Sequence, residues 1–174
     1  MTSAHEPSST AVEQRTPAAN SRWWWQGAIA GIVGAATLAA WFLILDVTRG
    51  KPLHTPTVLG MALRGGDVRL ESLDAVPASL GLTLLFTLVH GAAFLAIGIG
   101  AAWFFARIGQ MPRLALSILL LFIVLGVGFF LFVVVFARLP VDALFARDVL
   151  IGNAIAAFAM VACLMGEHPD RARG

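Results

Sequence analysis

The sequence predicts an all-α membrane protein, an antiparallel four-helix transmembrane bundle, and three observations support this fold class. Hydrophobic residues make up 59% of the 174 residues and charged residues only 13%, whereas a soluble domain carries about 45–50% and about 25%. The mean hydropathy is +0.84. The apolar residues also fall into long runs that charges separate. These observations argue against a soluble enzyme, a nucleic-acid-binding module and a disulfide-rich secreted domain.

The chain begins with a polar segment, residues 1–22, that precedes the first predicted span at 23–45. The polar segment is rich in Ser, Thr, Pro, Ala and charges, so we expect a disordered tail. The span contains no charge and is long enough to cross about 30 Å of hydrocarbon. Three tryptophans stand at its start, where indole rings favour the headgroup boundary. We therefore expect a retained anchor rather than a cleaved signal peptide.

A long loop, residues 46–78, follows the first span and is predicted to contain a short helix. Thr55 can serve as its N-cap, and Pro56 is tolerated at the first helical position. The pair Gly65-Gly66 is expected to end it. An apolar short helix outside a span is expected to lie on the membrane interface or to pack over the end of the bundle.

Three further spans and a C-terminal tail are predicted over residues 79–105, 114–137, 143–165 and 167–174. A last span that began at Val149 would be near the minimum length, so we place its start near residue 143. The turn between the second and third spans contains Gly109 and Pro112, and its shortness predicts that these helices are antiparallel neighbours. Residues 23–166 thus form one transmembrane domain.

Charges at the ends of the spans bear on orientation in the cytoplasmic membrane. We interpret Asp46, Arg49 and Lys51, and likewise Arg147 and Asp148, as solvated interface charges, with ion gates as an alternative. Four spans place both termini on one side, and basic residues are equally numerous on the two sides. The short second loop carries two arginines and no acid, and the longer first loop is easier to translocate. We therefore predict that both termini are cytoplasmic.

Small residues at four-residue spacing predict where the helices pack, because helix association in lipid depends on close backbone approach. Two such ridges are present, formed by Gly27, Gly31, Ala35 and Ala39 in the first span and by Ala92, Ala96 and Gly100 in the second. The side chains of the third span are large and apolar on every face of the helix, so we expect this helix to face lipid over most of its circumference.

Four polar residues are expected at depth in the membrane. Thr83, Thr87 and His90 follow one stripe of the second helix, and Asn153 lies at a matching height in the fourth. We expect His90 and Asn153 to face the interior and to be hydrogen-bonded to each other or to a common group. His90 is a candidate proton relay, ligand contact or haem ligand, but a neutral histidine that joins two helices is the favoured interpretation.

The sequence offers no set of residues typical of an enzyme, a cofactor site or a metal site. Haem bound between two histidines would need a second intramembrane His, and His5, His54 and His168 all lie outside the spans, so only haem shared with a partner chain stays open. The lone Cys163 cannot form an internal disulfide and is interpreted as a packing residue. We therefore expect no enzyme activity, no cofactor, no metal and no nucleic-acid partner.

Three stretches also carry a resemblance, namely residues 31–60, residues 86–91, and residues 150–157 together with His168-Pro169. They resemble an uncharacterised family of small four-span bacterial membrane proteins. That family has no assigned activity, so no catalytic or ligand-binding residue is carried over. The resemblance implies that His90, Asn153 and the Thr55-Pro56 segment belong to a recurring design.

These observations lead to two functional expectations. The first is a non-enzymatic structural or accessory subunit, which packs in the lipid bilayer with other membrane chains or with further copies of itself. The alternative is a small-molecule or proton carrier that acts as an oligomer around Thr83, Thr87, His90 and Asn153.

Overall fold

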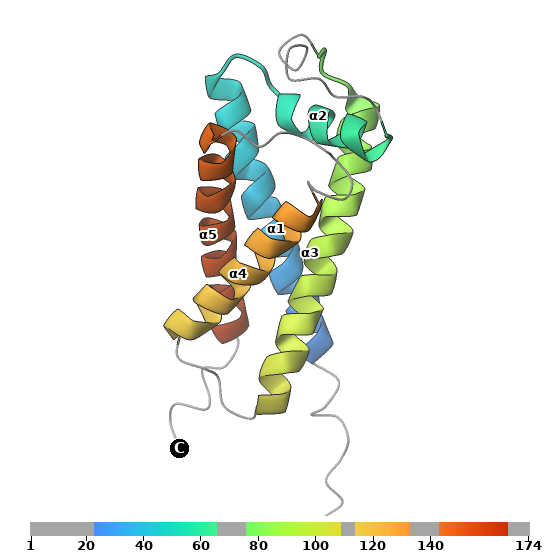
Figure 1. The fold of residues 1–174 in the computed structure, drawn as a ribbon. Coiled ribbons are helices and arrows are strands. Elements are labelled where there is room, and N and C mark those ends of the chain that lie inside the picture. Colours follow the sequence, from blue (N-terminus) through green and yellow to red (C-terminus); the bar gives the residue numbers. More distant parts are fainter. Residues whose placement is uncertain (1–22, 66–75, 109–113, 133–142, 167–174) are drawn as a thin grey trace, which may run out of the picture.

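The computed structural model describes residues 23–65, 76–108, 114–132 and 143–166, and within these ranges all the regular structure is helical. Figure 1 shows the five helices, which are α1 (Trp23–Thr48), α2 (His54–Leu63), α3 (Leu80–Ile108), α4 (Leu114–Phe132) and α5 (Ala143–Gly166). The two predicted tails, Gly66 and the turn with Gly109 and Pro112 lie outside the described residues. The all-helical fold class is thus confirmed for the described part of the chain.

Three of the helices are long and apolar enough to cross a membrane. They are α1, the Leu80–Arg107 part of α3 and the Ala146–Gly166 part of α5. The apolar part of α4, Leu116–Leu131, is shorter than these three, and residues 133–137 of the predicted third span lie outside the described ranges. A helical chain with three such helices has the character of an integral membrane protein.

Exposed tryptophans mark the end of the bundle where α1 begins and α3 ends. Trp24 and Trp25 stack with ring centroids 4.4 Å apart, and both are exposed. On α3, the guanidinium carbon of Arg107 lies 5.3 Å from the centroid of the exposed Trp103 ring. Indole rings and arginine at one level are typical of a membrane–water interface. This placement agrees with the first boundary that the sequence predicts.

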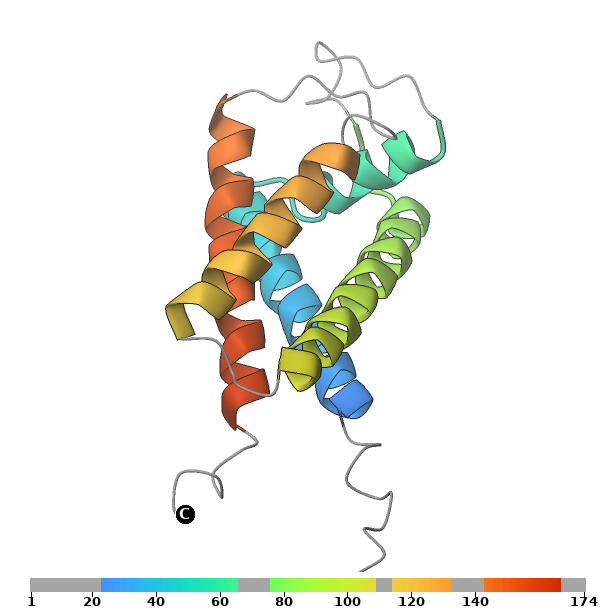
Figure 2. The same ribbon diagram turned by 60° about the horizontal axis from the view of Figure 1, so that its bottom comes forward.

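Helix α1 is the centre of the bundle, since α3 and α5 both pack along it, while α4 packs on α5 and α2 on α3. The prediction that the second and third spans are close neighbours is wrong, because α4 packs mainly on α5 and crosses it obliquely (Figure 2). Leu121 and Leu125 of α4 are buried in one cluster with Ala156 and Ala157 of α5. The small side chains of the two alanines leave room for these leucines, which explains why α4 packs on α5 rather than on α3.

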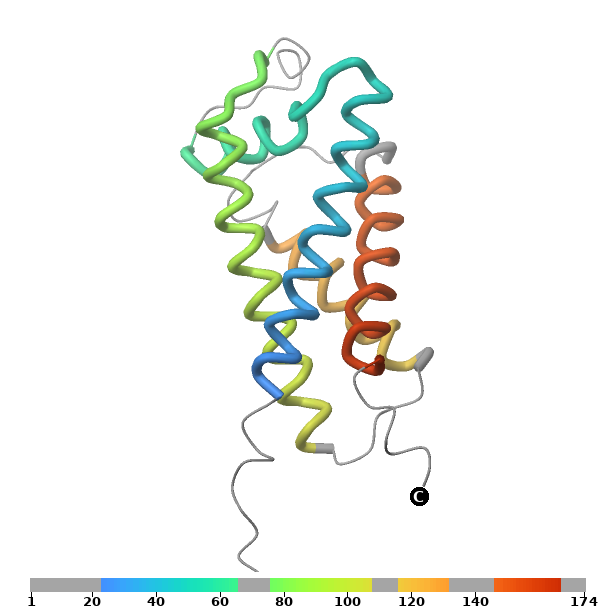
Figure 3. Tube along the Cα trace, turned by 180° about the vertical axis from the view of Figure 1, so that it is seen from behind, coloured from blue at the N-terminus to red at the C-terminus, as the bar shows by residue number. Residues whose placement is uncertain are grey.

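Helices α1 and α3 touch through glycine at one end and diverge toward α2 at the other (Figures 1 and 3). A Cβ atom added to Gly98 would lie 2.2 Å from the carbonyl oxygen of Gly27, and one added to Gly31 would lie 2.5 Å from that of Phe94. Both positions therefore exclude any side chain. The α1 ridge thus contacts α3 through Gly27 and Gly31.

The ridge predicted on α3 lies on the other side of that helix. Ala92, Ala96 and Gly100 are exposed, and a Cβ at Gly100 would meet nothing within 4 Å. Gly98 is two residues from both Ala96 and Gly100, and each residue turns an α-helix by about 100°. The contact face therefore points almost opposite to the predicted one. For packing within the chain, this part of the prediction is wrong.

Helix α2 lies across the end of α3 and begins at a sharp corner. Leu53, its N-cap residue, has φ 64° and ψ 14°, a left-handed conformation that is uncommon for leucine. At the other end Gly65 adopts φ 74°, and its amide donates to the carbonyl of Ala62, so glycine ends the helix as predicted. A Cβ at Gly60 would lie 2.2 Å from the carbonyl oxygen of Leu82, so α2 and α3 also touch through glycine.

Candidate functional site

A pocket of about 390 Å³ is lined mainly by residues of α1, α3 and the α2 region. Its walls come from residues 38–46 of α1, residues 83–90 of α3 and the first residues of α2, with Phe129 of α4 and Val149 of α5. Most of the lining is apolar, and the volume is within the range typical of small-molecule sites.

His90 lines this pocket from α3. Its ring lies between two phenylalanines, with centroids 5.4 Å from Phe86 and 4.6 Å from Phe94. Its Nε2 lies 3.4 Å from the backbone carbonyl oxygen of Ala35, a long hydrogen bond to the neighbouring helix. His90 therefore contacts α1 through the first-span ridge, consistent with a histidine that joins two helices.

Asn153 is buried in α5 but does not line the pocket. Its side chain is 2% exposed, and Nδ2 has no hydrogen-bond partner among the described residues. The predicted hydrogen bond between His90 and Asn153 is not present, and no common partner joins the two side chains in the described ranges. The reason lies in the packing order: α1 contacts both α3 and α5, so the two faces are turned toward α1 rather than toward each other.

The two threonines of the α3 stripe also line the pocket, but they use their hydroxyl groups differently. Thr87 donates to the carbonyl oxygen of Thr83 at 2.7 Å, so its proton is satisfied within its own helix. The Thr83 hydroxyl lies 3.2 Å from the hydroxyl of Thr57 in α2. Thr83 therefore links α3 to α2, a role that the sequence pattern did not reveal.

Thr57 is fully buried and connects three segments of the chain. Its hydroxyl donates to the carbonyl oxygen of Leu53 at 2.7 Å and accepts from the Ser79 amide at 3.2 Å. A threonine hydroxyl has one proton and two acceptor lone pairs. Because the proton goes to Leu53, the contact with Thr83 must be one in which Thr83 donates. Thr57 then has every hydrogen-bonding position occupied.

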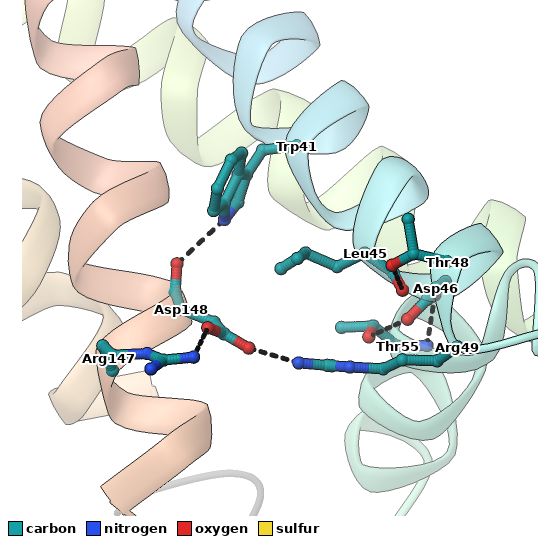
Figure 4. Close-up of polar contacts among 8 residues, drawn as sticks. All are labelled: Trp41, Leu45, Asp46, Thr48, Arg49, Thr55, Arg147 and Asp148. Carbon is teal, nitrogen blue, oxygen red and sulfur yellow. Dashed lines mark hydrogen bonds and ion pairs between the residues drawn. The ribbon is translucent and has the colours of Figure 1, made fainter.

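Asp46 caps α2 from the end of α1, as Figure 4 shows. Its carboxylate accepts the Thr55 amide at 2.8 Å and the Thr55 hydroxyl at 2.6 Å. A carboxylate at a helix N-terminus satisfies free amides and interacts favourably with the helix dipole. The predicted capping role of Thr55 is therefore wrong, since α2 begins at His54 and its first turn is capped by a distant residue. The prediction of a solvated Asp46 is also wrong, because it is only 2% exposed.

Asp148 ties the start of α5 to the end of α1 (Figure 4). Its buried carboxylate pairs with the half-exposed Arg49 and lies 3.5 Å from Arg147. Its backbone carbonyl accepts the Trp41 indole N–H at 3.0 Å. Asp148 is thus a buried, paired group rather than a solvated charge. Sequence reasoning missed this role because Arg49 and Trp41 lie about a hundred residues from Asp148 in the chain.

The comparisons with known proteins add no assignment: no family model, curated protein or solved structure matches this chain. Within the described ranges, His, Cys, Asp and Glu side chains form no group of three that could hold a metal ion. The carboxylate that lines the pocket, Asp46, has both oxygens engaged with Thr55. The pocket therefore offers apolar walls, hydroxyl groups and one imidazole, a set suited to binding a small molecule.

Proposed function

We propose that this chain is a four-span, non-enzymatic integral membrane protein that assembles with other membrane chains, either distinct subunits or further copies of itself. In this arrangement α4 is the third span. Its apolar part runs over Leu116–Leu131, and the sequence continues with the apolar residues 133–137, which together reach the length of a span. Both termini then lie on the cytoplasmic side of the cytoplasmic membrane.

The exposed ridge on α3 carries this proposal. Ala92, Ala96 and Gly100 present a small-residue surface of the kind that lets helix backbones approach closely in lipid. The chain uses the same kind of surface internally, at the contact of Gly27 with Gly98. The α3 ridge is exposed, and Gly100 has open space where a Cβ would stand. A second helix fits this surface better than disordered lipid chains do.

The test is extraction from the native membrane in a gentle detergent, followed by measurement of the mass and composition of the purified particle. We expect a stoichiometric partner protein or a defined homo-oligomer. Gly100→Leu should reduce assembly, whereas Gly128→Leu, at an exposed glycine of α4 that also faces open space, should not. A wild-type particle that contains one chain and no second protein would overturn the proposal.

The alternative is a small-molecule or proton carrier that acts as an oligomer around Thr83, Thr87, His90 and Asn153. Its support is the pocket, which the first three of these residues line. His90→Leu separates the two candidates, because a carrier should lose transport while it keeps its assembly. A histidine that only joins helices should instead lose stability or assembly.

A further inference from the structure

The polar side chains that line the pocket have almost no hydrogen atoms left to donate. Thr55 donates its hydroxyl proton to Asp46, and Thr87 donates its proton to the carbonyl of Thr83. Thr83 donates to Thr57, because the single proton of Thr57 goes to Leu53. The remaining capacity of these three hydroxyl groups is therefore that of acceptors.

His90 continues this pattern. A backbone carbonyl can only accept a hydrogen bond, so a neutral imidazole that bonds to Ala35 must carry its proton on Nε2. Nδ1 is then an acceptor, and no hydrogen bond engages it among the described residues. The strongest free acceptor among the described lining side chains is thus a ring nitrogen in the first half of α3.

The position of the pocket restricts what can reach it. Ala39, Ala40 and Leu43 of α1 line the pocket and are also exposed, and α1 is long and apolar enough to cross a membrane. A chain that spans the bilayer through α1 would therefore present this part of the pocket lining to apolar, membrane-dissolved ligands. No arginine or lysine is among the lining residues in the described ranges, so no cation is present there to hold a phosphate headgroup.

We propose that this pocket binds a neutral, membrane-dissolved lipid that bears a hydroxyl group, which is a long-chain or isoprenoid alcohol in chemical class. The hydroxyl group of the lipid donates to Nδ1 of His90, and its hydrocarbon tail lies along Leu38, Phe42 and Leu59. A molecule that only accepts hydrogen bonds, such as an ether, finds no free side-chain donor among the described lining residues. The site does not depend on the assembly proposed above, so binding and assembly can fail separately.

The test compares two probes that differ in the hydroxyl proton, dodecan-1-ol and its methyl ether. Their affinities for the purified full-length protein in detergent are measured by native mass spectrometry and by the shift in Tm. One neutral hydrogen bond corresponds to roughly threefold to tenfold in affinity, so we expect the alcohol to bind tighter by about that factor. Equal affinities of the two probes for the wild type would overturn the assignment.

Two variants locate the effect. His90→Phe keeps a ring between Phe86 and Phe94 but removes both nitrogens, and it should bind the two probes equally. Ala39→Phe fills the pocket and should weaken both probes at least tenfold. Ala36→Phe is its matched control, because Ala36 is exposed on the same helix and does not line the pocket.

Two outcomes would overturn the proposal, and the experiment still decides if His90→Phe does not fold. Unchanged binding in Ala39→Phe would show that the probes bind elsewhere and would overturn the site. A tightly held phospholipid that neither probe displaces would show that an acyl chain is the occupant, and would also overturn the proposal. If His90→Phe does not fold, as judged by size-exclusion chromatography, the wild-type preference together with the Ala39→Phe result still decides. The particle mass, measured in the same preparations, reports on assembly independently.

Discussion

The two ends of the α1–α3 pair are held together by different means. At one end the helices touch directly, because Gly27, Gly31 and Gly98 carry no side chains to separate them. At the other end the helices are apart and α2 bridges them, through Asp46 on one side and Thr83 on the other. The comparison shows that one pair of helices can be joined in two ways. At one end the backbones touch because glycine has no side chain, and at the other end specific hydrogen bonds through α2 hold the helices. The pocket lies between the two.

The largest expected effect is at the glycine end. Gly98→Ala places a Cβ 2.2 Å from a backbone oxygen of α1, and backbone cannot move aside as a flexible side chain can. We expect the free energy of unfolding, measured in mixed detergent micelles, to fall by about 3 kcal/mol.

The same helix offers the control for this change. Gly100→Ala adds the same methyl group two residues away, where nothing lies within 4 Å. Its unfolding free energy within the single chain should be unchanged or slightly higher, since alanine favours helix over glycine. Similar losses for both variants would contradict a direct backbone contact at Gly98.

The next largest effect is expected at the cap of α2. Asp46→Ala removes two charge-assisted hydrogen bonds to Thr55 and should lower the unfolding free energy by about 2 kcal/mol. Asp46→Asn retains an acceptor oxygen and should lose about half as much. Hydrogen exchange locates the change, because the amides of α2 should exchange faster while those around Gly98 stay protected. Unaltered exchange in α2 would refute the capping role.

The smallest effect is expected at Thr57. Thr57→Val keeps the branched shape but removes the oxygen that accepts from Ser79 and Thr83. Leaving the partly buried amide of Ser79 without this partner should cost about 1 kcal/mol. The measurement is again unfolding in mixed micelles. A Thr57→Val protein as stable as the wild type would show that the polar bridge contributes little and that the α2–α3 contact at Gly60 suffices.

What the sequence predicts well in this protein is the placement of long helices. Uncharged runs that start at Trp23 and near Ser79 leave few alternatives, because a buried charge is costly in lipid and a helix satisfies its own backbone. The stop of α2 at Gly65 follows from equally local information. The three longest helices are accordingly found close to the predicted boundaries.

What the sequence does not predict is which faces and which distant residues meet. Small residues occupy two opposite sides of α3, and spacing alone gives no reason to prefer Gly98 over Gly100. Asp46 and Asp148 look like ordinary interface charges, because their burial depends on Thr55, Arg49 and Trp41, which only the fold brings near. Contacts of this kind depend on tertiary geometry and have no periodic signature.

The crossing of α1 and α3 near Gly98 is also the point about which a rotation of α3 relative to α1 would change the width of the pocket. Thr83 stands roughly 22 Å farther along α3 at about 1.5 Å per residue, so a rotation of α3 by roughly 10° about the crossing would displace Thr83 by about 4 Å. A small angular change at the glycines is thereby amplified into a change of pocket width comparable to the diameter of an acyl chain. Helix α2 is hydrogen-bonded to α1 through Asp46 and to α3 through Thr57, so these hydrogen bonds hold the angle between the two helices and with it the width of the pocket.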